Sequence, residues 1–569
     1  MSQTNPSDAE RLALAEAWIA QDPDPETRAE LAALVEGARG GDAAATAELA
    51  DRFDTRLAFG TAGLRGEIAA GPNRMNRVLV AQAAAGLAAY LIERAAPGAA
   101  PSVVIGYDGR RNSAVFARDS AEVMAGAGVR AILLPRLLPT PVLAFAVRHF
   151  GTSAGVMVTA SHNPPNDNGY KVYLGDEHHG SQIVAPADAE IAAHIERVAS
   201  TTTVPELPRG EFETTDESVV DEYVRRTALV ADRPEAQPRV VYTAMHGVGW
   251  ETTARVLAEA GFEPPSLVEE QISPDPAFPT VAFPNPEEPG AMDLSFERAR
   301  AVGAELIIAN DPDADRLAVA IPDATEPSGY RRLSGNEVGL LLGWRNARRA
   351  ADAATGEGGA DGTLACSIVS SPGLEAVASA YDLGFEATLT GFKWISRAPG
   401  LLFGFEEALG YLVNPDTVRD KDGISAALAF LSLAAALKAE GRTVADHLDE
   451  FALRFGCFAS TQISLRVDDL SRIGEIMARL RAQPPASVGG IRVERIEDLA
   501  AGFGALPPSD VLRIVLEDGG RVMVRPSGTE PKLKVYIDAV ADRGSLEERR
   551  AAASAAITAL ESGMRELTA

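Results

Sequence analysis

The sequence predicts an α/β protein that is built from several similar units and ends in a smaller α+β unit. From Phe59 onward, short apolar runs with strand character alternate with longer runs of helical period, which is the pattern of β-α-β units with parallel strands. Near the C-terminus, two apolar runs flank Glu517-Asp518-Gly519-Gly520, a turn sequence typical of an antiparallel hairpin. A chain of 569 residues is too long for a single core, and we therefore expect four domains.

The expected elements follow from these periods. Residues 1–55 form an N-terminal helical extension, because apolar and acidic residues recur at helical spacing over residues 9–19 and 27–35. The expected strands of the α/β units are residues 103–107, 131–134, 239–242, 306–309 and 363–368. The expected helices are residues 115–126, 142–150, 252–260, 293–302 and 373–381. Residues 511–516 and 521–524 form the expected hairpin.

Stretches rich in proline or acidic residues mark the expected domain boundaries. The helical extension, residues 1–55, precedes four expected domains, which are residues 56–205, 206–325, 326–450 and 451–569.

The composition excludes some classes of partner. The chain carries 53 basic and 80 acidic side chains, a formal net charge of −27, which repels nucleic acid and anionic membrane surfaces. The start of the chain is polar and acidic, unlike a secretory signal. The longest apolar stretch, residues 424–437, is shorter than the roughly 20 residues that cross a bilayer. We expect a cytoplasmic protein in which this stretch is a buried helix and Cys366 and Cys457 are buried free thiols.

Asp311, Asp313 and Asp315 stand at alternate positions between two strand-like runs. Carboxylate oxygens are the ligands that Mg²⁺ prefers. A calcium-binding EF-hand is excluded, because counting from Asp311 places Arg316 and Pro322 where that loop requires glycine and glutamate. A solvated turn and a Mg²⁺ loop remain, and the position between two strands favours the Mg²⁺ loop.

Ser161 lies in a polar turn between the apolar runs 154–158 and 170–174. A serine in such a turn most often bonds its own backbone. Ser161 and His162 together suggest a hydrolase dyad, but we expect neighbours on an extended backbone to point to opposite sides. The turn also lacks the Gly-x-Ser-x-Gly elbow of acyl-transfer enzymes. A serine that carries a phosphoryl group beside Mg²⁺ fits the pattern better.

Three further groups of residues suit a phosphosugar. Residues 525–529, Arg-Pro-Ser-Gly-Thr, are rich in donors and small residues, so we expect a phosphate cradle rather than a simple turn. Glu406 and Glu407 are either acceptors for sugar hydroxyls or the start of an exposed helix. Lys171 and Lys421 are either surface residues or acid/base groups of a closed phosphate site.

Taken in chain order, four of these loops resemble the signature loops of the α-D-phosphohexomutase superfamily, the phosphoglucomutase/phosphomannomutase group. The four loops are residues 159–163, 311–316, 405–410 and 525–529, and further matches are residues 60–66, 245–249 and 390–394. The resemblance spans nearly the whole chain. It implies a four-domain phosphohexomutase architecture, with three mixed α/β domains and a TBP-like α+β domain around a central cleft.

The resemblance also implies a reaction, an intramolecular phosphotransfer that isomerises a phosphosugar. Phosphorylated Ser161 would give its phosphoryl group to a sugar phosphate, and the bisphosphate would reorient and return its other phosphate to the serine. Mg²⁺ would lie on Asp311, Asp313, Asp315 and an oxygen of phosphorylated Ser161. The implied catalytic residues are Ser161, Lys171, Lys421, Arg65 and His162. The implied substrate contacts are Thr390, Gly391, Lys393, Glu406, Glu407, Arg316, Arg525, Ser527, Gly528 and Thr529.

The sugar is a separate question. Many hexose mutases carry serine where this chain has Ala408, and residues 404–411 resemble the branch that holds α-phosphoglucomutases related to phosphopentomutase. We expect glucose phosphate as first choice, mannose phosphate as second and pentose phosphate as third, with glucose 1,6-bisphosphate as primer. A glucose-1,6-bisphosphate synthase and a non-catalytic phosphosugar-binding protein are the alternatives of another class. We expect a monomer or weak homodimer.

Overall fold

The computed structural model describes residues 6–354, 361–467, 469, 471–504, 506–527 and 532–569. The chain divides into two compact units. The first comprises residues 1–332 and 410–432, and the second comprises residues 333–409 and 433–569.

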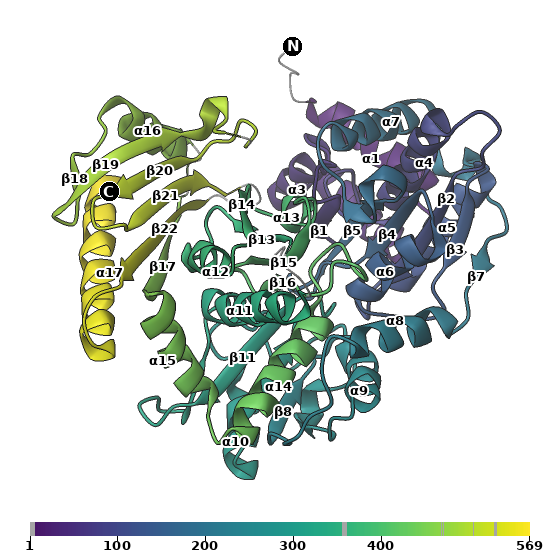
Figure 1. The fold of residues 1–569 in the computed structure, drawn as a ribbon. Coiled ribbons are helices and arrows are strands. Elements are labelled where there is room, and N and C mark those ends of the chain that lie inside the picture. Colours follow the sequence, from purple (N-terminus) through teal and green to yellow (C-terminus); the bar gives the residue numbers. More distant parts are fainter. Residues whose placement is uncertain (1–5, 355–360, 468, 470, 505, 528–531) are drawn as a thin grey trace. The chain divides into compact units, whose positions relative to one another are not determined.

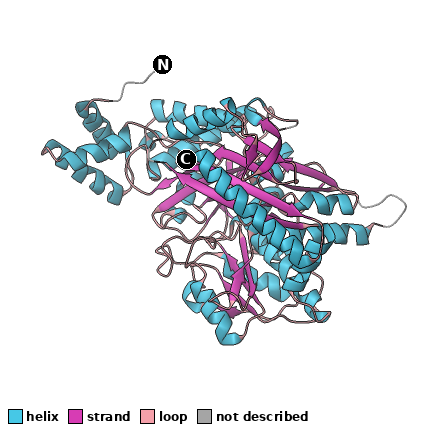
Figure 2. Ribbon diagram, turned by 90° about the vertical axis from the view of Figure 1, so that its left-hand side faces the viewer, coloured by secondary structure: helices cyan, strands magenta, loops and turns pink. Residues whose placement is uncertain are grey.

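Three helices form the N-terminal extension, as the sequence predicts (Figures 1 and 2). They are α1 (Asp8–Gln21), α2 (Pro25–Arg39) and α3 (Ala43–Phe53). Helix α1 begins at a capping box, in which the Ser7 side chain accepts from the backbone of Glu10 while the Glu10 carboxylate accepts from Ser7. The indole of Trp18 meets the ring of Phe53 edge to face, with 6.2 Å between ring centroids, so the apolar faces of α1 and α3 pack together.

The first sheet has the strand order β1-β5-β4-β2-β3-β7, with β6 on β5. Its strands are β1 (Leu64–Glu67), β2 (Ser102–Tyr107), β3 (Arg130–Leu133), β4 (Ala154–Val158), β5 (Asp167–Leu174), β6 (Ser181–Gln182) and β7 (Glu213–Thr214). Its helices are α4 (Arg77–Arg94), α5 (Ser113–Gly126), α6 (Thr140–Phe150) and α7 (Ala187–Thr201). Strands β2, β3 and β4 are parallel, whereas β5 is antiparallel to β4, so the sheet is mixed. Strand β7 lies beyond residue 205 and pairs with β3.

The connections of this sheet create a crevice. The chain leaves β2 through α5 to reach β3 on one side, and then returns through α6 to β4 on the other side of β2 (Figure 1). Right-handed crossovers therefore place α5 and α6 on opposite faces. The strand order reverses between β2 and β4, and ligands bind at the carboxyl ends of strands at such a point. The turn that holds Ser161 follows β4 at this place.

The second sheet also belongs to the first unit and has the order β12-β11-β10-β8-β9. Its strands are β8 (Val240–Thr243), β9 (Ser266–Leu267), β10 (Leu306–Asn310), β11 (Leu317–Pro322) and β12 (Tyr330–Arg332). Its helices are α8 (Ser218–Ala228), α9 (Gly249–Glu259) and α10 (Asp293–Val302). Strands β8 and β10 are parallel, and β10 and β11 are antiparallel. The short connection between β10 and β11 is the three-aspartate loop.

The second unit contains a parallel α/β layer and an antiparallel layer. In the α/β layer, β13 pairs in parallel with β14 and β15; its elements are α11 (Gly335–Ala353), β13 (Thr363–Ser367), α12 (Gly373–Ala380), β14 (Gly384–Thr388), α13 (Phe392–Ile395) and β15 (Leu401–Glu406). The antiparallel sheet has the order β17-β22-β21-β20-β19-β18. Its strands are β17 (Cys457–Arg466), β18 (Ser487–Val488), β19 (Ile491–Asp498), β20 (Leu512–Leu516), β21 (Arg521–Pro526) and β22 (Lys532–Ala541).

The antiparallel sheet is covered by helices, which makes the end of the chain an α+β unit. Helix α17 (Leu546–Thr568) lies along β22 and β17 (Figures 1 and 2), and its buried Leu560 and Met564 join the same apolar core as the strands. Helices α15 (Val444–Phe455) and α16 (Ser471–Ala482) complete the unit. The predicted hairpin is confirmed as β20 and β21.

Helix α14 (Gly423–Ala439) confirms the buried helix expected at residues 424–437, since most of its apolar side chains are inaccessible to solvent. Strand β16 (Gly410–Leu412) precedes it. Of the two free thiols, Cys366 is buried as expected, but the prediction is wrong for Cys457, which is only half-buried at the start of β17. Strand β17 lies at the edge of its sheet, and an edge strand has a neighbour on one side only.

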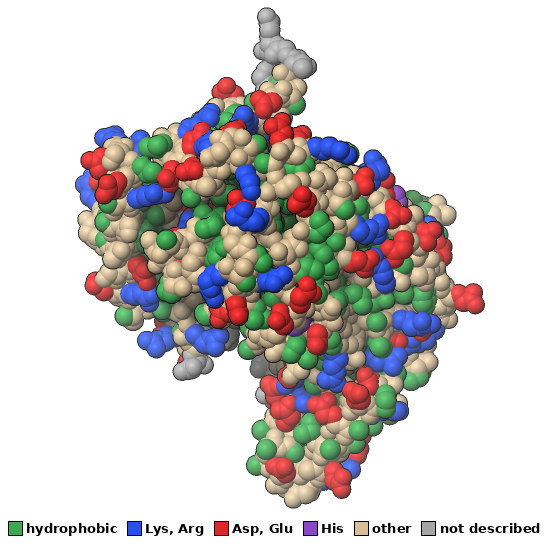
Figure 3. All heavy atoms as spheres, turned by 90° about the horizontal axis from the view of Figure 1, so that it is seen from below, with side chains coloured by type: hydrophobic (Ala, Val, Ile, Leu, Met, Phe, Trp, Pro, Cys, Tyr) green, Lys and Arg blue, Asp and Glu red, His purple; other side chains and the backbone are tan. Residues whose placement is uncertain are grey.

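Among the described residues, no single helix has the length and apolar composition to cross a membrane; only α14 and α15 together pass that test, as a pair bent by 94°. Acidic and basic side chains are interspersed on the face that Figure 3 displays.

Candidate active site

The turn of Ser161 connects β4 to β5 and is tightly constrained. Ser161 has a φ of 51°, a left-handed conformation that is unusual for a residue with a side chain. Its backbone N–H donates to Thr159 Oγ1 at 2.8 Å. The residue is 2% exposed, so the hydroxyl is held inside the protein at the carboxyl end of the sheet.

The Ser161 hydroxyl contacts an acid and an imidazole. Ser161 Oγ donates to Asp311 Oδ2 at 2.7 Å and lies 3.2 Å from His162 Nδ1. The expectation that Ser161 and His162 point to opposite sides is therefore wrong, because it assumed an extended backbone and the left-handed turn at Ser161 brings the two side chains together. With the hydroxyl hydrogen directed at Asp311, His162 Nδ1 is the donor to Oγ.

His162 remains neutral near pH 7. Burial and the nearby guanidinium groups of Arg316 and Arg65 lower its pKa well below the ordinary value. Arg65 also donates to Asn163 Oδ1 at 3.1 Å, which places its guanidinium at the Ser161 turn. Both predicted residues, Arg65 and His162, thus lie beside the serine.

The three aspartates form a buried cluster, not a solvated turn. Asp311, Asp313 and Asp315 are fully buried, and one carboxylate oxygen from each lies within 4.8 Å of the others. Burial and the two neighbouring carboxylates raise the pKa of Asp311 well above its usual range. Such repulsion between carboxylates is relieved by a cation.

The loop has oxygen atoms to offer to that cation. Asp313 Oδ1 and Asp315 Oδ1 are buried and accept no hydrogen bond from any described residue, and Ser161 Oγ approaches Asp311 beside them. Hard oxygen ligands of this kind suit Mg²⁺. The donor set therefore fits the metal that the sequence predicts.

Two lysines face the opposite oxygens of the same carboxylates. Lys171 Nζ, on β5, donates to Asp313 Oδ2 at 2.7 Å and to Asp315 Oδ2 at 2.9 Å. Lys421 Nζ lies 3.3 Å from Asp315 Oδ2. Burial favours the neutral form of Lys171, but the two carboxylates outweigh it and raise its pKa. Both lysines are buried, which excludes the interpretation as ordinary surface residues.

Thr140 is a site residue that sequence reasoning missed. At the start of α6, its hydroxyl donates to Asp313 Oδ2 at 2.7 Å and its N–H donates to the Asp313 carbonyl at 2.9 Å. The two sheets of the first unit are joined at this point. A lone threonine between two prolines gives no signal of that role in the sequence.

Lys421 is held by residues that were also missed. Tyr173 donates from its hydroxyl to Asp420 Oδ2 at 2.8 Å, and Gln182 Nε2 donates to the same oxygen at 2.7 Å. Asp420 Oδ1 accepts from the N–H of Lys421 at 2.8 Å. On the other side, Asp422 accepts from the Tyr223 hydroxyl at 3.0 Å. The backbone of Lys421 is therefore fixed between two buried carboxylates.

Arg316 follows the aspartates directly. Its N–H donates to Asp311 Oδ1 at 2.9 Å, and its guanidinium Nε lies 3.9 Å from Asp315 Oδ1. The carbonyl of Arg316 accepts from Asn310 Nδ2 at 2.7 Å, so a hydrogen bond joins the two ends of the three-aspartate loop.

The predicted phosphate-binding residues lie in the second unit. Arg525, on β21, donates to Thr390 Oγ1 at 2.6 Å, so two of the predicted substrate contacts meet. Gly391 has a φ of 108°, which favours glycine, and Lys393 lies on the short helix α13 that follows. Ser527 donates from its N–H to the Lys532 carbonyl at 2.8 Å. Gly528 and Thr529 lie outside the described residues.

Glu406 and Glu407 lie at the end of β15, so the alternative of an exposed helix start is wrong. Glu407 is fixed by a serine pair that was not foreseen. The hydroxyls of Ser367 and Ser370 donate to Glu407 Oε2 at 3.2 and 3.0 Å, and the Glu407 N–H donates to Ser370 Oγ at 3.1 Å. Arg521 in turn donates to the Ser370 carbonyl. A carboxylate held this way has a defined direction.

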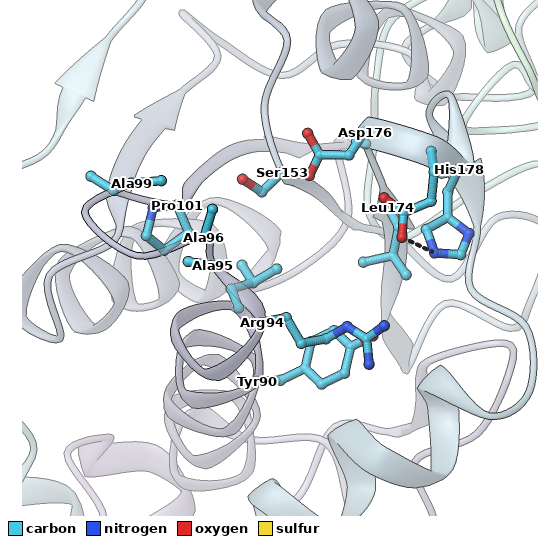
Figure 4. A pocket seen from close by; sticks show the side chains of 14 residues that line it. Tyr90, Arg94, Ala95, Ala96, Ala99, Pro101, Ser153, Leu174, Asp176 and His178 are labelled. Atoms are coloured by element: carbon cyan, nitrogen blue, oxygen red, sulfur yellow. Dashed lines mark ion pairs between the residues drawn. The ribbon is translucent and has the colours of Figure 1, made fainter.

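A separate cavity of about 390 Å³ lies at the other end of β5, beside Leu174 and the neighbouring Asp176 and His178 (Figure 4). Its wall includes Arg94, whose guanidinium lies over the ring of Tyr90 at 5.3 Å from the centroid. The Ser161 turn lies at the opposite end of β5, and Lys171, in the middle of the strand, does not line the cavity, so this cavity is distinct from the candidate site.

Comparison with protein families covers most of the chain. Models of the phosphoglucomutase/phosphomannomutase α/β/α domains I, II and III match residues 56–202, 221–324 and 334–455, and the model of the C-terminal domain matches residues 466–556. The chain belongs to the phosphoglucomutase/phosphomannomutase family. It has the four-domain architecture that the sequence predicts, with three α/β domains and a C-terminal α+β domain. It is an enzyme that isomerises a phosphosugar.

Relatives that are named for different activities resemble the chain. A probable phosphomannomutase of Haemophilus influenzae is 56% identical over 82% of this chain and 93% of its own. A phosphopentomutase of Mus musculus is 34% identical over 93% and 90%, and a phosphoglucomutase of Staphylococcus aureus is 35% identical over 86% and 91%. The crystal structure of a putative phosphomannomutase from Thermus thermophilus superimposes with a TM-score of 0.65 at 25% identity, covering 90% of this chain and 99% of that one.

Proposed function

We propose that the protein interconverts the 1-phosphate and 6-phosphate of glucose, with Ser161 as the phosphoryl carrier and glucose 1,6-bisphosphate as intermediate and primer. The contact of Ser161 Oγ with Asp311 at 2.7 Å, inside the buried three-aspartate cluster, carries this proposal. It places a hydroxyl nucleophile against the carboxylates that would hold a divalent cation. That combination serves phosphoryl transfer.

In this proposal, Asp311, Asp313 and Asp315 hold Mg²⁺ together with an oxygen of phosphorylated Ser161. When bound, the cation neutralises charge that develops on the phosphoryl oxygens. Thr140 and Lys171 hold Asp313 through its other oxygen, so Asp313 Oδ1 is left for the metal. His162 donates to Ser161 Oγ and orients it.

The two transfers are mirror images. A hydroxyl oxygen of the sugar phosphate attacks the phosphorus on Ser161, and the bond from phosphorus to Oγ breaks. The proton of the sugar hydroxyl passes to a base of the enzyme, and a proton passes to the leaving Oγ, which becomes a hydroxyl. In the return transfer, Ser161 Oγ loses its proton and attacks the other phosphate of the bisphosphate, and a proton passes from the enzyme to the sugar oxygen that leaves. No phosphoryl group passes to water, so the enzyme ends in the state in which it began.

We assign the proton to Lys421. Lys171 Nζ makes two short hydrogen bonds to carboxylates, which hold its proton in place. Lys421 Nζ lies farther from its carboxylate partners, at 3.3 and 3.8 Å from Asp315 and Asp420. Asp420 and its hydrogen bonds to Tyr173 and Gln182 fix the lysine backbone while Nζ moves a proton.

The second unit would supply the substrate contacts. Arg525, with Thr390, Lys393 and the 527–529 turn, would bind the phosphate that is not being transferred. Glu406 and Glu407 would accept hydrogen bonds from sugar hydroxyls, with Glu407 aimed by its two serines. Arg316 would contact the phosphate beside the metal.

Mannose phosphate is the second candidate substrate, favoured by the 56% identity with the probable phosphomannomutase. Mannose and glucose differ in the direction of one hydroxyl. A hydrogen-bonding site distinguishes such sugars through the groups that accept from that hydroxyl, and Glu406 and Glu407 are the acceptors we assign. Kinetic comparison is therefore decisive.

The test is an initial-rate comparison of glucose, mannose and ribose 1-phosphates with Mg²⁺ and catalytic glucose 1,6-bisphosphate. We expect kcat/KM to be highest for glucose 1-phosphate. A preference for mannose would replace the sugar and keep the mechanism, whereas a preference for ribose would assign a phosphopentomutase. Product formation from an acyl phosphate donor without primer would indicate the bisphosphate synthase.

The Ser161→Ala variant controls the mechanism itself. It removes one buried oxygen and leaves the turn backbone in place, so we expect a folded protein with no mutase turnover. Appreciable residual flux in this variant would contradict the role of Ser161 as phosphoryl carrier.

A further inference from the structure

Arg110 lies in the turn after β2, directly beside the strand that leads to Ser161. Its side chain is 1% exposed. Its guanidinium donates to the Ser161 and Asn163 carbonyls, both at 2.6 Å, and to the Pro164 and Asp167 carbonyls at 2.8 and 3.1 Å. Four carbonyls of the Ser161 turn thus converge on one side chain. The turn bends around the guanidinium.

The obvious alternative is that Arg110 is a core ion pair with Asp108. Arg110 and Asp108 do form an ion pair, with 3.7 Å between Arg110 Nε and Asp108 Oδ2. This distance is too long for a hydrogen bond, so the N–H groups of the guanidinium are left for the Ser161 turn. Asp108 instead accepts from the Ser113 hydroxyl at 2.7 Å and from the Arg110 backbone N–H at 3.0 Å. Asp108 therefore holds the Arg110 backbone, and the guanidinium serves the Ser161 turn.

The conformation of Ser161 needs this support. A left-handed backbone is unfavourable for a residue with a side chain, and the peptide of Ser161 is held on both sides. Its N–H donates to Thr159 Oγ1 and its carbonyl accepts from Arg110. With the backbone in this conformation, the Ser161 side chain points toward Asp311 and His162 and contacts both.

A residue of the second α/β domain, within the same compact unit, packs against the Arg110 guanidinium. The guanidinium lies 5.0 Å from the ring centroid of Phe278, a cation–π contact. His246 meets the Phe278 ring edge to face at 6.4 Å, and its Nε2 lies 2.8 Å from Thr280 Oγ1. His246 belongs to residues 245–249, a motif of the sequence that the reaction itself does not use.

We propose that Arg110 is a positioning residue for phosphoryl transfer. It holds the Ser161 turn in the conformation that presents Oγ to the metal carboxylates, and Phe278 keeps the guanidinium in place. This inference rests on the proposed role of Ser161 as phosphoryl carrier. Arg110 acts on the serine through the backbone and does not contact the substrate.

The Arg110→Lys variant tests the proposal. Lysine keeps the charge, but a single ammonium group lacks the planar fork that reaches four carbonyls. We expect kcat for glucose 1-phosphate to fall about 100-fold, and KM to stay within about twofold. The rate at which glucose 1,6-bisphosphate phosphorylates Ser161, followed by intact-protein mass spectrometry, should fall by the same factor as kcat.

Two further variants keep the test decisive. Arg111→Lys is the matched control, because Arg111 is half-exposed and bonds to Glu26, so all three quantities should equal those of the wild type. Phe278→Leu leaves the hydrogen bonds of Arg110 intact and removes only the ring. We expect it to lower kcat and the phosphorylation rate by about three- to tenfold, with KM unchanged. This variant decides the question if Arg110→Lys does not fold.

The outcomes are separable from those of the proposed function. If wild-type Ser161 is never phosphorylated by the bisphosphate, the proposed function fails and the inference fails with it. If the wild type is phosphorylated and both variants are phosphorylated equally fast, only the positioning role is wrong. A loss of kcat with a parallel rise in KM and an unchanged phosphorylation rate would also overturn it, since that pattern describes weakened substrate binding.

Discussion

At the scale of single residues, the site is a set of carboxylates whose two oxygens have different partners. Asp313 accepts from Thr140 and Lys171 through Oδ2, while Oδ1 is buried and accepts no hydrogen bond from the part of the chain that the structure describes. Asp315 repeats this arrangement, with Lys171 on Oδ2. One oxygen of each residue thus fixes the side chain, and the other is positioned where it could bind the proposed cation.

The Asp313→Asn variant tests this division. Asparagine keeps the shape and one oxygen but removes a negative charge, and the number of charged ligands sets the affinity for Mg²⁺. We expect the Mg²⁺ concentration for half-maximal activity to rise about tenfold or more. Mg²⁺ titration of the initial rate, supported by calorimetry, gives the measurement.

The matched control is Asp323→Asn. Asp323 follows β11, the strand after the metal loop, and accepts from the N–H of Thr325 in an outer turn, so its Mg²⁺ dependence should equal that of the wild type. Equal half-saturation in the Asp313 variant and the wild type would remove Asp313 from the metal site.

At the scale of elements, the turn between β8 and α9 packs against the three-aspartate loop. A Cβ atom added to Gly247 would lie 2.3 Å from Pro312 Cα, so the two backbones are in contact. The N–H of Val248 donates to the Pro312 carbonyl at 2.9 Å. The motif at residues 245–249 is therefore explained by close packing, since only glycine permits this approach.

Gly247→Ala should disturb both stability and the metal site. Displacing the metal loop to admit a methyl group costs about 1–3 kcal/mol, so we expect a lower Tm and weaker activation by Mg²⁺. The comparison is Gly474→Ala near the start of α16, where an added Cβ meets no atom within 4 Å. That substitution should raise Tm, because alanine favours a helix by about 1 kcal/mol over glycine. A normal Tm in the Gly247 variant would show that the contact is not rigid.

At the scale of the whole molecule, both compact units contain buried histidines that fold in the neutral form. Burial lowers the pKa of His246 in the first unit and of His447 in the second. His447 is stacked on Trp344 with 4.2 Å between ring centroids. When folding lowers the pKa of a histidine, the unfolded chain binds more protons than the folded protein at pH values below the ordinary pKa of 6.5. Each such histidine therefore lowers the free energy of unfolding as the pH falls from 6.5 toward its pKa in the folded protein.

A comparison of variants isolates this effect from buried carboxylates, whose raised pKa values act in the opposite direction. His447→Gln cannot take up a proton, so its Tm should fall less between pH 7.5 and pH 5.5 than the wild-type Tm does. Calorimetry with saturating Mg²⁺ measures the change of Tm with pH in both proteins, and in the proposed metal site the cation would keep Asp311 ionised. Parallel slopes in the two proteins would mean that His447 does not contribute to acid lability.

The regular elements were predictable because their signal is local. Helix α10 has the same ends as the predicted residues 293–302, and strands β2, β8 and β10 each lie within one residue of their predicted bounds. Strands β2, β8 and β10 are short apolar runs that are buried along nearly their whole length, a local pattern that indicates a strand. The short β7 escaped prediction, because two residues are too few to show a period.

The chain by itself determined the family, the order of its elements and the chemistry available in each signature loop, since these depend on residue type and spacing. The tertiary structure decided how those groups are used. The backbone at Ser161 adopts a left-handed conformation that few residues with a side chain adopt. Arg110 binds carbonyls of the Ser161 turn, and Thr140 binds Asp313, and both contacts join residues that are far apart in the chain. Such contacts cannot be predicted from the local sequence, because each depends on which strand ends the fold brings together.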